Sequence, residues 1–134
     1  MWTKYGLILV CMLPLAVQAQ DCTTDDSVHN VIEACKKQIQ RDKQVIATES
    51  AKLKHLVQQH NRQYMQISVE KEWNQSQQLW QRFVEADCAL ESVPSQVSQG
   101  SGYAVAETSC LAKRYRQRVM QIRQLQKEIR SLSE

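Results

Sequence analysis

Four of the five cysteines carry the clearest chemistry in this chain of 134 residues: Cys22, Cys35, Cys88 and Cys110. The fifth, Cys11, lies in the apolar amino-terminal segment that we expect to be removed. Thiolate metal sites usually place two ligands a few residues apart, but the chain has no Cys-x-x-Cys and no histidine at ligand spacing from a cysteine. We therefore expect no metal and two disulfides, as in an exported protein. Four cysteines allow three pairings, and short loop closure favours Cys22 with Cys35 and Cys88 with Cys110.

The sequence contains no arrangement of residues that is typical of catalysis. It has no nucleophile paired with a histidine in a recognisable motif, no glycine-rich phosphate loop and no carboxylate pair in an apolar segment. His29 and Glu33 lie one helical turn apart, as do His60 and Tyr64, and we interpret both pairs as surface contacts. We therefore expect a protein that is not an enzyme and that needs no cofactor.

The amino-terminal segment has the pattern of a secretory signal peptide. Lys4 supplies a positive charge, residues 6–17 form a short apolar core, and Ala19 ends a small-residue cleavage site. A membrane span needs about 20 apolar residues, and Pro14 interrupts this shorter run, so an uncleaved anchor is the less favoured alternative. We predict that cleavage after Ala19 leaves residues 20–134 as one domain, in the periplasm or outside the cell.

The remaining chain is predicted to be helical. Between Thr23 and Val93 it has neither glycine nor proline, and capping residues place the first helix start near Asp25. A single helix over this stretch would be about 100 Å long, so we expect a break, first at residues 58–62 and second at residues 66–68. The predicted fold is a small all-α bundle, stapled by disulfides, with three main helices: a long antiparallel hairpin and a C-terminal helix.

Apolar residues at three- and four-residue spacing predict one buried face on each helix. In the first helix, polar residues interrupt the repeat at Asp42 and again at Glu49 or Ser50. The second helix has an apolar and aromatic stripe formed by Trp73, Leu79, Trp80, Phe83, Val84, Cys88 and Leu90. The last helix repeats at Leu111, Tyr115, Arg118, Ile122, Leu125, Ile129 and Leu132. We place the centre of the core at Trp80, Phe83 and Leu111.

The segment from Ser92 to Gly102 is predicted to be a loop, because it is rich in serine and glycine and contains Pro94. Cys88 and Cys110 flank it, so a bridge between them would tie its two sides together. Two interpretations stay open: a passive connection, or a protruding contact surface whose shape the bridge fixes.

The balance of charge favours no single class of partner, since the chain without its signal segment has 16 basic and 14 acidic residues. Between Leu111 and Arg130 the C-terminal helix has one acid, Glu128, and seven basic residues: Lys113, Arg114, Arg116, Arg118, Arg123, Lys127 and Arg130. Such a helix is either a solvated face or a contact for an anionic cell-wall or envelope surface. Its end, with Ile129 and Leu132, offers a route to a homo-dimer. We expect no nucleic acid partner.

Several groups of residues resemble a known family. They are the run Trp80 to Ala89, with Phe83 and Cys88; Gly100-Ser101; Cys110-Leu111, with Arg118 eight places after the cysteine; Asp21-Cys22; and Glu33-Ala34-Cys35. Together they resemble the bacterial lysozyme inhibitor LprI N-terminal domain family. The chain departs from that pattern at Val84, where arginine is usual, and at Tyr115, where threonine is frequent.

The resemblance implies a small helical domain outside the cytoplasm that binds a protein, with a lysozyme as the candidate partner. Many lysozymes are strongly basic, so charge complementarity favours an acidic contact surface. We place this surface beside the predicted loop, at Glu85, Asp87, Glu91 and Ser101. The acids near the amino terminus, Asp21, Asp25 and Asp26, are the alternative. An envelope structural or assembly protein that uses its basic C-terminal helix is the second hypothesis for function.

Overall fold

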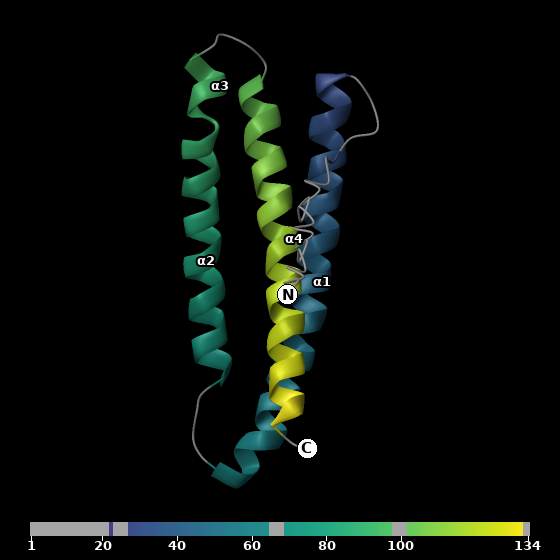
Figure 1. Cartoon of the computed structure of the whole chain (residues 1–134), viewed down its shortest axis with the longest axis vertical. Helices are drawn as coiled ribbons and strands as arrows, with labels where there is room; N and C mark the ends of the chain where they lie inside the picture. The colour runs from purple at the N-terminus through teal and green to yellow at the C-terminus, as the bar shows by residue number, and fades with distance from the viewer. Residues whose placement is uncertain (1–21, 23–26, 65–68, 98–101, 133–134) are drawn as a thin grey trace, which may run out of the picture.

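The computed structural model describes residue 22 and residues 27–64, 69–97 and 102–132. These residues form four helices: α1 (Val28–Tyr64), α2 (Val69–Glu91), α3 (Val93–Val97) and α4 (Gly102–Ser131). In Figure 1, α2 runs antiparallel to both α1 and α4, which are parallel to each other. The predicted all-α bundle of three main helices is therefore confirmed. None of the described helices is long and apolar enough to cross a membrane, and the predicted signal peptide lies outside the described residues.

Ser27 caps the first helix. Its Oγ accepts a hydrogen bond from the backbone N–H of Asn30 at 3.3 Å, and its carbonyl accepts from Val31 at 3.1 Å. A serine at this position satisfies amide groups that have no partner inside the helix. Helix α1 thus begins at Val28, slightly after the predicted start near Asp25.

The break in the long helical stretch falls between Tyr64 and Val69. The first choice, residues 58–62, is wrong, because α1 continues through this segment as regular helix. Glutamine, histidine, asparagine and arginine are polar there, but none of them prevents helix formation as proline does. The second choice, residues 66–68, lies in the interval between α1 and α2, outside the described residues.

The predicted loop from Ser92 to Gly102 is wrong at Val93–Val97, which form α3, and at Gly102, which begins α4. Residues 98–101 lie outside the described part of the chain. Proline fits the first turn of a helix, where its missing N–H has no role, so Pro94 does not prevent this short helix. Ser92 joins α2 to α3: its N–H donates to the carbonyl of Cys88 at 3.1 Å, and its own carbonyl accepts from Ser95 at 3.1 Å. Ser92 is fully buried.

The core lies mainly along the interface of α1 with α4, and α2 packs chiefly on α4. The buried apolar side chains are Cys35, Leu53, Val84, Cys88, Ala112, Tyr115, Val119 and Ile122. The predicted repeat on α4 is correct at Tyr115 and Ile122, but Leu125 and Leu132 are exposed. Ala112, Val119 and Gln126 are buried as well, so the buried face of α4 includes the positions that directly follow Leu111, Arg118 and Leu125.

The prediction that Phe83 is a core residue is wrong, because its side chain is 61 % exposed, and Leu79 and Leu90 of the same stripe are exposed too. The bond from Cys88 to α4 determines which side of α2 faces inward. Val84 lies one turn before Cys88 and is buried, whereas Phe83 lies about 140° around the helix from Cys88. Of the other predicted core residues, Trp80 and Leu111 are half-buried.

Candidate partner-binding site

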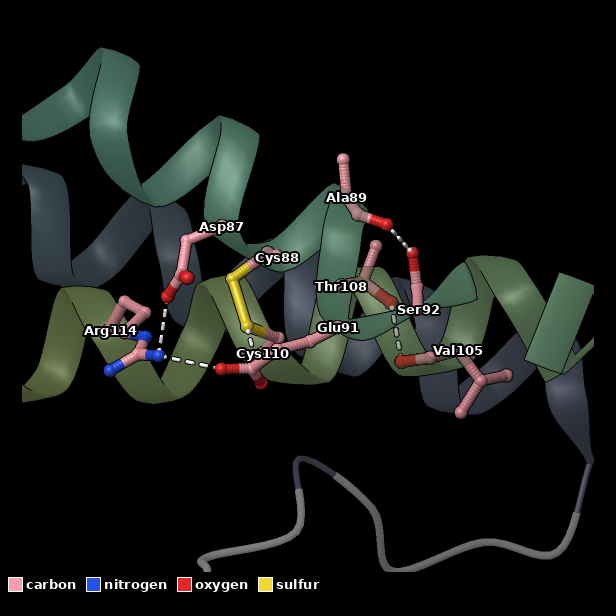
Figure 2. The surroundings of a disulfide bond; sticks show 9 residues. All are labelled: Asp87, Cys88, Ala89, Glu91, Ser92, Val105, Thr108, Cys110 and Arg114. Atoms are coloured by element: carbon pink, nitrogen blue, oxygen red, sulfur yellow. Dashed lines mark hydrogen bonds and ion pairs between the residues drawn. A yellow bond between two sulfur atoms is a disulfide. The ribbon is translucent and has the colours of Figure 1, made fainter. Parts of the chain in front are cut away.

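The two disulfides in the structure are Cys22–Cys35 and Cys88–Cys110, the pairing that short loop closure favoured. Their Cα atoms are 4.8 Å and 5.5 Å apart, both within the usual range. The second bridge links α2 to α4 close to the point where the chain leaves α2 (Figure 2). It therefore fixes the position of the acidic residues that precede the end of α2.

Arg114 lies one turn after Cys110 on α4 and contacts two of those acids (Figure 2). Its Nη2 donates to a carboxylate oxygen of Asp87 at 2.6 Å and to one of Glu91 at 2.7 Å. The side chains of Arg114 and Asp87 are less than one third exposed, which makes the charge-assisted contact between them stronger than an ordinary surface ion pair. Arg114 and the disulfide together hold the end of α2 against α4.

The structure places the predicted contact residues in different surroundings. Glu85 is exposed and accepts a hydrogen bond from Gln81 at 3.0 Å. Asp87 and Glu91 are both paired with Arg114, which offsets much of their charge. Ser101 lies outside the described residues. The acidic group is therefore close in space, but two of its three carboxylates already have an internal cation.

Arg118 joins α4 to α2 through two tryptophans. Its guanidinium carbon lies 5.6 Å from the ring centre of Trp73 and 5.4 Å from that of Trp80. Its Nε donates to Oε1 of Gln77 and its Nη2 to Oγ of Ser76, each at 3.1 Å. Burial lowers the pKa of this arginine, although the group stays protonated. An arginine that belongs to the family-like pattern is thus a packing residue here.

Trp80 also packs edge-to-face on Tyr115, with ring centres 5.1 Å apart. Tyr115 is buried, and this burial, with a smaller effect of Glu85, raises the pKa of its hydroxyl. Lys43 of α1 lies 5.5 Å from the centre of the same ring. These aromatic contacts join all three long helices. A shallow groove of about 520 Å³ between α1 and α2 is lined partly by Trp73, Trp80 and Tyr115.

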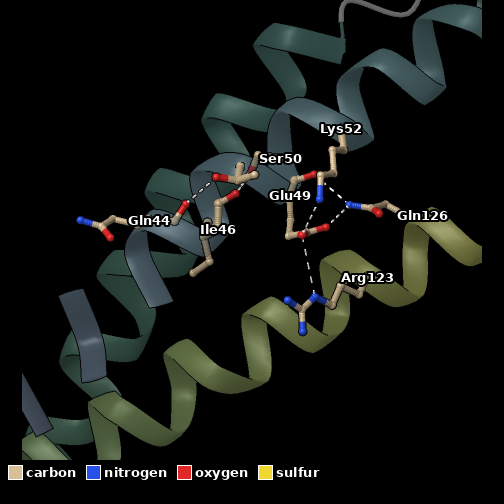
Figure 3. Close-up of polar contacts among 8 residues, drawn as sticks. Gln44, Ile46, Glu49, Ser50, Lys52, Arg123 and Gln126 are labelled. Atoms are coloured by element: carbon tan, nitrogen blue, oxygen red, sulfur yellow. Dashed lines mark hydrogen bonds and ion pairs between the residues drawn. The ribbon is translucent and has the colours of Figure 1, made fainter. Parts of the chain in front are cut away.

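A set of polar contacts between α1 and α4 was missed by the sequence analysis. Asp42, which is buried, accepts from Nε of Arg116 at 3.3 Å. Glu49, also buried, accepts from Nε2 of Gln126 at 2.8 Å (Figure 3). The hydrogen bonds from Gln126 and Lys52 lower the pKa of Glu49 against the opposing effect of burial. The residues that we interpreted as interruptions of an apolar repeat are therefore part of the interface.

The sequence contains a signal for these contacts. Ser109, Arg116 and Arg123 of α4 recur every seven residues, as do Cys35, Asp42 and Glu49 of α1. Each residue of the first set contacts the corresponding one of the second: Ser109 with Cys35 at 3.7 Å, Arg116 with Asp42 at 3.3 Å, and Arg123 with Glu49 at 4.0 Å. A shared heptad spacing of complementary polar residues indicates two parallel helices in register.

Most of the basic residues of α4 contact the neighbouring helices of the bundle. Four of the seven contact acidic or polar groups of α1 or α2: Arg114, Arg116, Arg118 and Arg123. This helix is therefore not a continuous unpaired cationic face along its described length. Among the described residues there is also no cluster of histidine, cysteine and acid side chains that could hold a metal ion.

Comparison with known proteins agrees with the resemblance seen in the sequence. The family model described as lysozyme inhibitor LprI matches residues 19–122, a span that includes both disulfides, Arg114 and Arg118. No curated protein and no solved structure matches the chain. Since the family model covers well over half of its residues, the chain belongs to the LprI lysozyme inhibitor family.

Proposed function

We propose that the processed chain is an exported inhibitor that binds a lysozyme and slows its action on the cell wall. The observation that carries this proposal is the family match over residues 19–122. Two disulfides suit an oxidising compartment outside the cytoplasm. The inhibitor acts by binding and covering the lysozyme, and it performs no chemical step of its own.

The structure supports this mode of action because the helices are held in a fixed arrangement. The Cys88–Cys110 bridge, the Arg114 ion pairs and the aromatic contacts of Arg118 all hold α2 on α4. A surface that is already ordered loses less conformational entropy on binding than a flexible one. A small domain built in this way can therefore present a preformed contact surface to an enzyme.

The test uses purified, oxidised residues 20–134 and a turbidity assay of cell-wall lysis by a basic lysozyme. We expect lysis to slow in proportion to the concentration of the protein, and the same sample after reduction and alkylation to be much less effective. An oxidised, folded protein that leaves lysis unchanged at tens of micromolar would contradict the proposal.

A second candidate is an assembly role through the end of α4, where Leu125 is 44 % exposed and Leu132 is 82 % exposed. These apolar side chains could pair two copies or help the helix to lie on an anionic envelope surface. The internal contacts of four arginines weaken the second of these roles. Light scattering of the wild-type protein and of Leu125→Gln would show whether this helix makes a dimer.

A further inference from the structure

Helix α2 carries an apolar stripe that no other described helix covers. Leu79 is 58 % exposed, Phe83 61 % and Leu90 70 %. They are spaced by four and seven residues, so they lie on one face of the helix. We call these three residues the outer stripe. Large apolar side chains exposed together in this way commonly mark a site of interaction.

The outer stripe lies away from the packed side of α2. Helix α2 contacts mainly α4 and has few contacts with α1, and Figure 1 shows it at the edge of the bundle. The residues that face α4, including Val84 and Trp80, are about a third of a turn around the helix from the stripe. Neither the core nor the aromatic contacts of Arg118 use the outer stripe.

Helix α2 is also the acidic helix of the bundle. It has five acidic and two basic residues, whereas α1 has three acidic and seven basic residues and α4 has two acidic and seven basic residues. Glu72 is exposed and lies one heptad before Leu79, so it continues the line of the stripe. Glu70 is paired with Lys54, and Asp87 and Glu91 are paired with Arg114, so the acidic charge in line with the stripe is that of Glu72. An apolar stripe with an acidic end is complementary to a basic surface with an apolar cleft.

We propose that the outer stripe is the surface that docks on the lysozyme, with Phe83 as its central anchor and Glu72 as a charged end. This inference rests on the proposed function and deepens it, since it moves the contact surface from the paired acids beside Arg114 to the open face of α2. The partner that fits is a basic protein with an apolar groove. A helix that presents apolar residues at such spacing binds a groove of this kind.

A second copy of the chain is a poorer occupant of the same face. Pairing α2 with α2 of another copy along the stripe would bury the exposed carboxylate of Glu72 against an apolar face, and burying a carboxylate without a cation is costly. A basic partner instead gains from the same charges, and its binding weakens as salt screens them.

The experiment compares Leu79→Gln, Phe83→Gln and Leu90→Gln, singly and together, with Met120→Gln as the matched control. Met120 lies on α4 and is 62 % exposed, so its substitution removes a similar apolar side chain from another surface. The readouts are inhibition of lysis and the Kd for the lysozyme by calorimetry, with circular dichroism melting to compare folding. We expect Phe83→Gln to weaken binding about tenfold or more, and Met120→Gln to leave it unchanged.

Glu72→Lys tests the contribution of charge to binding. We expect it to lower the affinity for the lysozyme, and we expect this loss to be smaller at high salt. If the wild type inhibits and the folded triple variant inhibits equally well, the outer stripe is not the docking surface, while the proposed function stands. If the wild type neither binds nor inhibits lysozyme, both proposals fail. If the wild type is a dimer that Phe83→Gln converts to a monomer, the stripe is a self-association surface and this inference is overturned.

Discussion

Gln126 donates from Nε2 to the carboxylate of Glu49 at 2.8 Å and to the backbone carbonyl of the same residue at 3.0 Å (Figure 3). Both residues are buried between α1 and α4. A buried carboxylate is costly unless it is hydrogen-bonded, so this contact holds the two helices in one register. Polar residues thus determine an alignment that apolar side chains alone would specify less strictly.

Replacing Gln126 by leucine is expected to lower the free energy of unfolding by about 1–3 kcal/mol, because Glu49 loses its buried hydrogen-bond donor. Urea unfolding followed by circular dichroism measures the change. The matched control is Gln124→Leu, an exposed position on the same helix, where we expect little effect. Equal effects of the two substitutions would show that the buried contact does not contribute to stability.

The same contact predicts a dependence of stability on pH. The folded-state pKa of Glu49 is lowered, first by its hydrogen bond from Gln126. A lowered pKa gives a contribution that is present above the unfolded value and lost as pH falls through the folded value. The urea concentration at the unfolding midpoint should therefore decrease as the pH is lowered below about 4.5. The pKa of Glu33 is also lowered, by Lys36, so the measurement compares wild type with Gln126→Leu, which should lose less stability on acidification.

Helix content, the bundle and the cysteine pairing were predictable because they depend on local composition and short loops. The exposure of Phe83 was not, since an aromatic residue beside Val84 fits either face of α2 until Cys88 is known to bond to α4. The buried Asp42 and Glu49 were missed because each looks like a surface residue on its own helix. Only their alignment with Arg116 and Arg123, from the other end of the chain, explains them.

Arg114 is expected to restrain the charge of Asp87 and Glu91, which lie on the same helix as the outer stripe. Arg114→Gln would remove the ion pairs with Asp87 and Glu91 and reduce stability by about 1 kcal/mol, a modest loss because these groups are partly exposed. It would also leave two carboxylates without their cation, so affinity for a basic lysozyme should rise at low salt. Calorimetry at low and high salt tests this, with Lys113→Gln, an exposed neighbour, as the control for net charge. If Arg114→Gln and Lys113→Gln bind the lysozyme with the same affinity, the net charge of the protein matters for binding and the position of the removed charge does not.

Arg118 should be replaceable by lysine only at a cost in stability. Lysine retains the positive charge, but it lacks the planar group that lies near Trp73 and Trp80 and donates to Gln77 and Ser76 at the same time. We expect Arg118→Lys to lower the free energy of unfolding by about 1–2 kcal/mol. In residues 20–134, Trp73 and Trp80 are the only tryptophans, so a change in tryptophan emission reports directly on this site.

Arg123→Lys, whose arginine is 56 % exposed and 4.0 Å from Glu49, is the control that should leave both emission and stability nearly unchanged. An Arg118→Lys protein with wild-type emission and wild-type urea midpoint would mean that the positive charge alone, without the planar contact, accounts for the contribution of Arg118 to stability.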